Sequence, residues 1–239
     1  MALVESVLAN SVNNGTDATS YAGSSTTPAA GSLLVEFAIV NKTDGVPTTP
    51  TVSAWGLTWT LVDSILYDGV TQGKLFCWVA GPATGTASGI TLDFGGVTQH
   101  GINMWGIAFA GAATTNNGQD GIAQHVTNSG SGTAMSVTLG NSPLHTDNRP
   151  LVRYGFGAAT TVTPEAAWLE FADANHANPN TGGETQYRDN GGGWDNTSTG
   201  TLAATAAWGA IALEISVVAP GGGGATVSDP FGMTGFFGG

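Results

Sequence analysis

The chain has 239 residues, of which only 9% are charged and 37 are glycine. Seven tryptophans and a hydrophobic fraction of 41% exclude a disordered chain, because such chains lack the apolar side chains needed for a core. The formal net charge of −12, with basic residues scattered along the sequence, argues against nucleic-acid binding, which needs a clustered basic face.

The N-terminal sequence "MALVESVLANS" has no basic region followed by an apolar run, so we expect no secretory signal. No apolar segment approaches the roughly 20 residues that a membrane-spanning helix needs. We therefore expect a soluble protein that is made without Sec-type export and does not span a membrane.

Short β-branched and aromatic runs, bounded by Gly, Pro, Asn and Asp, predict strands along the whole chain. Helical periodicity is nearly absent, so an all-β fold is expected. The first half contains strands at 33–40, 57–67, 73–80, 90–94 and 102–110. The second half contains strands at 134–139, 151–158, 167–172, 184–188 and 206–218.

The two sets of strands resemble each other in the same order, which indicates an internal duplication with repeats at about 26–112 and 133–218. For example, "SLLVEFAIV" resembles "RPLVRYGFGA", and the similarity pairs Leu33 with Leu151, Trp59 with Trp168, and Trp105 with Trp208. Two such halves predict a jelly-roll-like two-sheet sandwich over 1–218, with these four tryptophans in the core.

Few residues have the spacing that catalysis or metal binding requires. Cys77 lies in the apolar run "KLFCWVA", which indicates a buried thiol. His100, His125, His145 and His176 are too far apart in sequence to predict a zinc site. Carboxylates near Trp168 suggest a glycosidase-like acid pair, but their spacing along one strand supplies no cleft; they are Glu165, Glu170 and Asp173. We expect no catalytic residue, no metal and no cofactor.

The segment "RDNGGGWDN" at 188–196 is expected to be a hairpin loop between adjacent strands, with glycines that permit positive φ. It lacks the ligand pattern of an EF-hand. Three uses remain open for this loop: a turn or inter-subunit contact, a glycan contact, or metal binding in another geometry. The glycan contact would involve Trp194 as the stacking ring, with Asp189, Asn190, Asp195 and Asn196 as its polar neighbours.

After residue 218 the composition changes to a Gly-rich and Phe-containing extension, 219–239, which we expect to be flexible. Its apolar side chains either fold back on the sandwich or dock into a neighbouring subunit. Docking would make them assembly contacts; they are Phe231, Met233, Phe236 and Phe237.

The series "TPAAGSLLVEFAIVN", "GLTWTLVDS", "WVAGPATGTASGITLDFGG" and "WGIAFAGA" resembles β-sandwich virion proteins of tailed bacteriophages, of the head-decoration and minor-tail type. This resemblance spans about 26–218 and contains no catalytic signature. It implies an accessory protein of the virion, assembled in the host cytoplasm, that contacts the major capsid or tail protein. It also implies a homo-oligomer, with a trimer as the expected state.

Two functions follow as hypotheses. The first is a non-enzymatic structural component of a phage virion, on the outer surface as a capsid-decoration or minor tail protein. The alternative is a carbohydrate-binding module of a receptor-binding apparatus, which holds a host glycan through the loop that contains Trp194. A polysaccharide-degrading enzyme would need two carboxylates facing each other across a cleft, for which the spacing gives no sign.

Overall fold

The computed structural model describes residues 3–67, 72–140, 143, 145–188 and 194–217. The described part consists of β-strands and one short 3-10 helix, η1 (Asn116–Gly121), so the expected all-β two-sheet sandwich is confirmed. The strands are β1 (Val4–Asn14), β2 (Ser20–Ala22), β3 (Leu33–Asn41), β4 (Thr51–Ser53), β5 (Thr60–Leu66), β6 (Gly73–Ala80), β7 (Thr91–Asp93), β8 (Gly101–Ala110), β9 (Ile122–Thr138), β10 (Arg149–Phe156), β11 (Val162–Pro164), β12 (Trp168–Ala177), β13 (Asn180–Arg188) and β14 (Thr197–Ile215).

The first half of the chain forms a five-stranded antiparallel sheet in the order β1-β8-β3-β6-β5. Its central strand, β3, pairs Phe37 with Cys77 on one side and with Trp105 on the other. All nine residues of β3 are buried, because both faces of this sheet are covered by other parts of the chain. A near-continuous apolar run is the sequence pattern expected of such a strand.

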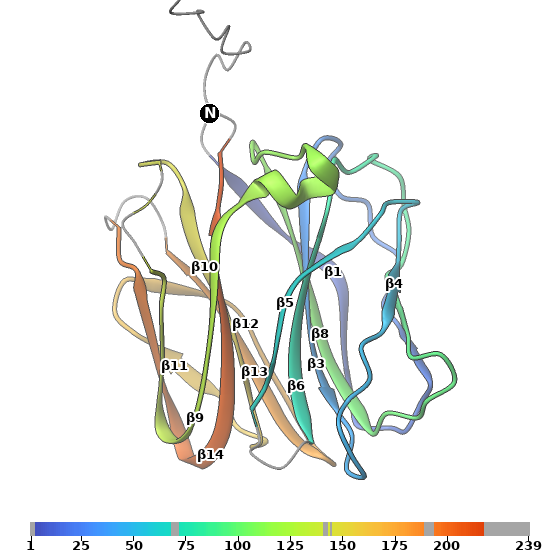
Figure 1. Cartoon of the computed structure of the whole chain (residues 1–239), viewed down its shortest axis with the longest axis vertical. Helices are drawn as coiled ribbons and strands as arrows, with labels where there is room; N and C mark the ends of the chain where they lie inside the picture. Colours follow the sequence, from blue (N-terminus) through green and yellow to red (C-terminus); the bar gives the residue numbers. More distant parts are fainter. Residues whose placement is uncertain (1–2, 68–71, 141–142, 144, 189–193, 218–239) are drawn as a thin grey trace, which may run out of the picture.

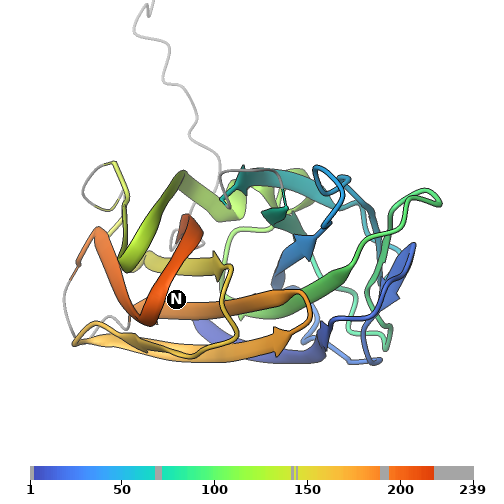
Figure 2. The ribbon, with the colours of Figure 1, turned by 90° about the horizontal axis from the view of Figure 1, so that it is seen from below.

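The second half forms a sheet with the same strand order, β9-β14-β10-β13-β12, to which the short β11 adds on the other side of β14. The first strand of each half, β1 or β9, lies at one edge beside the last strand, β8 or β14. The opposite edge is formed by β5 in the first sheet and by β12 in the second. Figures 1 and 2 show the two halves side by side, the first in blue to green and the second in yellow to red.

A β-bulge occurs in the equivalent edge strand of each sheet, β5 in the first and β12 in the second. The register of β5 shifts between Leu61 and Asp63, and the register of β12 shifts between Glu170 and Ala172. The extra residues are Val62 and Phe171, and both pack against the cluster between the sheets. A bulge adds one residue to one strand and bends it locally. The shared bulge and strand order are features that an internal duplication would produce.

The structure corrects two details of the predicted repeat. The equivalent units begin earlier than 26 and 133, because β1 and β9 are their first strands. Pairing Leu33 with Leu151 makes Gly209 the counterpart of Trp105, since Phe37 pairs with Trp105 and Gly155 pairs with Gly209. The predicted match to Trp208 is therefore displaced by one residue, and Trp208 points to the opposite face.

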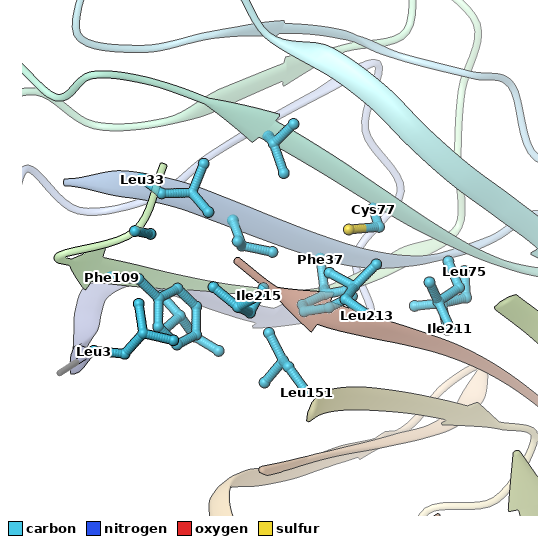
Figure 3. Packing of buried hydrophobic residues seen from close by; sticks show 14 of the residues in the cluster. Leu3, Leu33, Phe37, Leu75, Cys77, Phe109, Leu151, Ile211, Leu213 and Ile215 are labelled. Atoms are coloured by element: carbon cyan, nitrogen blue, oxygen red, sulfur yellow. The ribbon is translucent and has the colours of Figure 1, made fainter. Parts of the chain in front are cut away.

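The main core lies between the two sheets, and Figure 3 shows leucine, isoleucine and phenylalanine side chains from both sheets meeting there. The first sheet contributes alternate residues of β3, including Leu33 and Phe37, and the second contributes Leu151 and Leu213. Each fully buried side chain of this type stabilises the fold by roughly 1.5 to 3 kcal/mol. Cys77 lies in the same cluster and is buried, as predicted.

The outer face of each sheet has its own cluster. A three-stranded sheet, β2-β7-β4, covers the first one, and β11 with the bent end of the β9–β14 hairpin covers the second. The prediction that four tryptophans fill the core between the sheets is wrong for three of them, since only Trp105 packs against that core. Trp168 and Trp208 are buried in the second outer cluster, whereas Trp59 and Trp105 are half-buried against the first outer cluster and the central core.

The hairpin predicted for "RDNGGGWDN" is wrong. The segment joins β13 to β14, and β10 lies between these two strands in the sheet. The two strands are therefore not a hairpin pair. The amino-acid sequence did not reveal this, because a Gly-rich connection can join either two adjacent strands or two strands that are separated by a third.

Candidate functional site

The described part of the predicted glycan loop is held by contacts within the chain. Trp194 is half-buried against the outer cluster of the second sheet. Asp195 accepts a hydrogen bond of 3.0 Å from the Arg188 guanidinium, and Asn196 donates one of 3.0 Å to the carbonyl of Leu139. These interactions fix the residues that precede β14, and they engage two of the polar side chains predicted to contact a sugar.

Other predicted site residues lie outside the described residues. These are Asp189 and Asn190 of the loop, and the assembly contacts Phe231, Met233, Phe236 and Phe237 of the C-terminal extension.

A polar groove lies at one end of the sandwich, where both halves contribute residues. It consists of two cavities of about 400 and 340 Å³ that share Thr43 and Pro179 as lining residues. The other polar side chains that line it are Asp17, Asn41, Gln72, His100, Asn178 and Asn180, together with the buried Tyr67. Sequence reasoning missed this groove because its polar side chains come from five separate segments.

Hydrogen bonds within the groove fix several of these groups. The backbone N–H of Thr43 donates to Nδ1 of His100 at 2.6 Å, which leaves the imidazole proton on Nε2. Asn41 accepts from Thr181 at 2.6 Å, and Gln72 donates to the carbonyl of Thr43 at 3.1 Å. Among the described lining residues, Asp17 is the only carboxylate. The groove therefore presents hydrogen-bonding groups but no facing acid pair of the glycosidase kind.

Three carboxylates gather elsewhere, on the outer face of the second sheet. Carboxylate oxygens of Glu170, Asp173 and Glu184 all lie within 4.8 Å of one another. The sequence singled out the first two as neighbours of Trp168, but Glu184 comes from another strand and was missed. Glu170 is exposed, Asp173 is half-buried and Glu184 is completely buried.

The ionisable side chains of Glu36 and Arg153 are also completely buried, on opposite sides of the first sheet. Glu36 accepts a hydrogen bond of 3.0 Å from Asn10, and burial raises the pKa of Glu36 to about 8. Arg153 lies between the sheets, where its guanidinium donates to Asn103 at 2.5 Å and to Thr185 at 2.6 Å. Burial lowers the pKa of Arg153 to about 10, so this side chain remains charged at neutral pH.

Exposed apolar side chains gather on the edge strands. Of the seven large hydrophobic residues that are exposed in the described part of the chain, five lie on β1, β5 or β12: Val4, Val7, Leu61, Leu66 and Leu169. These strands form the edges of the two sheets. An edge strand has unpaired backbone groups, so apolar side chains there favour contact with another chain.

Within the described residues, no helix has the length and apolar character needed to cross a membrane. Comparison of the chain with protein-family models, with curated proteins and with solved structures finds no match.

Proposed function

We propose that the protein is a non-enzymatic accessory component of a phage virion, located on the outer surface as a capsid-decoration or minor tail protein. The observation that carries this proposal is the concentration of exposed apolar side chains on sheet edges. Burial of these side chains against another subunit would stabilise an assembly by removing apolar surface from water. The resemblance to virion β-sandwich proteins supplies the class of partner.

In this proposal the protein acts through contacts between copies of itself and with the major capsid or tail protein. An edge strand contributes both unpaired N–H and C=O groups and apolar side chains, which is the combination used when one chain adds a strand to the sheet of another. The central core needs no partner, since the two sheets already cover each other's inner faces.

The test is co-sedimentation of the purified chain with empty heads and, separately, with tails of the phage that encodes it, combined with native mass spectrometry. We expect binding to one of the two and a homo-oligomer in solution. Leu61→Lys on β5 should weaken both the binding to the phage particle and the formation of the homo-oligomer. The matched control is Val97→Lys, because Val97 is exposed to the same extent, 41%, but lies outside the named strands.

A monomeric protein that binds neither heads nor tails would contradict the proposal. Equal loss of binding in Leu61→Lys and Val97→Lys would contradict the role of the sheet edges.

The polar groove supports a second candidate, a carbohydrate-binding module that holds a host glycan. Amide, hydroxyl and imidazole groups line it, and such groups both donate to and accept from sugar hydroxyls. Saturation-transfer NMR with soluble host polysaccharide tests this candidate. Binding by a monomer that is lost in Gln72→Ala and kept in Asn128→Ala, a variant of an exposed residue outside the groove, would favour it over the structural role.

A further inference from the structure

The bulge in β12 places two carboxylates on one face of the strand. Glu170 and Asp173 are three residues apart, so a regular strand would direct them to opposite faces. The register shift between Glu170 and Ala172 adds one residue, which brings both to the outer face. Asp173 pairs directly with Glu184 on the neighbouring β13. This is why oxygens from all three carboxylates lie within 4.8 Å of one another.

Glu184 is the buried end of this cluster and has no hydrogen-bond partner of its own. Its exposed fraction is 0%, and neither of its carboxylate oxygens makes a hydrogen bond. Tyr154 lies opposite Glu184 on β10, but its hydroxyl donates to the carbonyl of Ser198 at 2.8 Å. A buried carboxylate without a partner is costly in free energy, so two unsatisfied oxygens that face other carboxylates indicate a missing positive group.

Asp173 is held in place beside it. Its Oδ2 accepts a hydrogen bond of 2.9 Å from the backbone N–H of Val162 on β11, which leaves the buried Oδ1 without a partner. Unpartnered oxygens of Asp173 and Glu184 thus adjoin the exposed carboxylate of Glu170. The cluster is graded from solvent to interior, with Glu170 at its exposed end and Glu184 at its buried end.

Among the described residues, no cationic side chain forms an ion pair with the cluster, and the charge of Arg153 only partly offsets the rise in the pKa of Glu184 and Asp173. The nearest buried guanidinium, that of Arg153, lies on the other face of the sheet and donates to Asn103 and Thr185. Burial, together with repulsion from Glu170 and Asp173, raises the pKa of Glu184 to about 9. Burial also raises the pKa of Asp173, with repulsion from Glu170 as a further cause. A bound cation would reverse both shifts, because it favours the charged carboxylates.

We propose that Glu170, Asp173 and Glu184 bind one divalent cation, of which calcium is the best match. All three ligands are carboxylate oxygens, with no imidazole or thiolate among them, which suits a hard cation. Calcium accepts irregular geometries and either one or two oxygens from each carboxylate, whereas magnesium demands a near-octahedral arrangement. The ion would tie the edge strand β12 to β13 and, through Asp173, to β11.

The experiment uses the full chain, stripped with EDTA and dialysed at pH 7. Calcium chloride is then titrated by calorimetry and in thermal unfolding, with magnesium chloride and sodium chloride at equal ionic strength as comparisons. We expect saturable binding of one calcium ion per chain. We also expect a rise in Tm of about 5 °C when free calcium exceeds Kd about a hundredfold.

Two conservative variants remove ligands without changing the size of the side chain, namely Glu184→Gln and Asp173→Asn. Each should abolish the heat of calcium binding and the calcium-dependent rise in Tm, while circular dichroism still shows the native sheet. The matched control is Asp93→Asn, which changes the net charge equally at an exposed position on β7. It should keep the full calcium response.

Absence of calcium binding at millimolar concentration in the wild-type chain would overturn the proposal. In that case Glu184 holds a proton in place of an ion, and Glu184→Gln would raise Tm to the same extent with calcium or with EDTA. A response to magnesium but not calcium would equally refute the assignment to calcium.

Discussion

The guanidinium of Arg153 on β10 donates a hydrogen bond of 2.5 Å to Oδ1 of Asn103 on β8, which joins the two sheets through their apolar interior. Asn103 in turn donates to the carbonyl of Ala174 on β12 at 2.8 Å. A buried charge of this kind is stable only while its hydrogen bonds are satisfied. The pair therefore fixes how the sheets lie against each other.

We expect Asn103→Ala to lower the free energy of unfolding by about 2 to 4 kcal/mol, because it removes one of the two side-chain acceptors of the buried guanidinium. The measurement is urea unfolding. The control is Asn13→Ala, which removes two exposed hydrogen bonds between β1 and β12, to the Asn175 carbonyl and to the His176 ring, and should cost less than about 1 kcal/mol. In the double variant Asn103→Leu with Arg153→Met, most of the loss should be recovered; additive losses would show that the pair is not coupled.

The stability of the protein should fall as pH rises above neutrality. Glu36 is neutral in the fold at pH 7, because burial raises its pKa from 4.5 to about 8, while in the unfolded chain it is ionised. The folded state thus binds more protons between these two values, so the contribution is complete below about pH 4.5 and is lost as pH rises through about 8.

Glu36→Gln removes this dependence. Between pH 6 and pH 9, in calcium-free buffer, the wild-type free energy of unfolding should fall by roughly 2 kcal/mol more than that of the variant. Glu165→Gln, a change at an exposed carboxylate, should follow the wild-type curve. Parallel curves for the wild type and Glu36→Gln would show that Glu36 is ionised in the fold.

The space for Glu36 and Asn10 depends on a glycine. A Cβ atom at Gly106 would lie 2.4 Å from Oε2 of Glu36 and 2.8 Å from Oδ1 of Asn10. We expect Gly106→Ala to destabilise the protein by about 2 to 3 kcal/mol in urea unfolding, since both neighbours are buried and cannot move away freely. Gly140→Ala, where no atom lies within 4 Å, should be within about 0.5 kcal/mol of the wild type.

The thiol of Cys77 should not react with thiol reagents in the folded protein. Its side chain is completely buried, and burial, with the nearby carboxylates Asp63 and Glu36, raises the pKa of the thiol well above its usual value. Because the thiolate is the reactive form, Ellman's reagent should label Cys77 only as the protein unfolds. Labelling at the same rate with and without urea would contradict the buried position.

All ten strands predicted from β-branched and aromatic runs correspond to strands of the structure. Four strands were missed, namely β1 and the short β2, β4 and β11, and so was the first part of β9. β1 reads "VESVLANSVNN", and the first part of β9 is rich in Gly, Ser and Asn. These segments are extended because they pair with β8 and β14 through the backbone, and their own side chains give little strand signal. Strand propensity depends on such context, which a single sequence does not contain.

The functional groups were less predictable than the strands. Spacing along a regular strand places Glu170 and Asp173 on opposite faces, and only the bulge at Phe171 brings them together. Their third partner, Glu184, and the pairing of Arg153 with Asn103 depend on which strands become neighbours in space. The polar groove also depends on which segments become neighbours in space, because residues from both halves of the chain line it.

The central core has the composition of a dimer interface, with like sheets contributing one face each. Here both sheets belong to one polypeptide, joined through η1. Their association is therefore an intramolecular step, whose equilibrium is set by the effective concentration that the connection imposes and not by the amount of protein present. Dilution cannot separate the two halves, and the sandwich is complete as soon as a single chain has been synthesised.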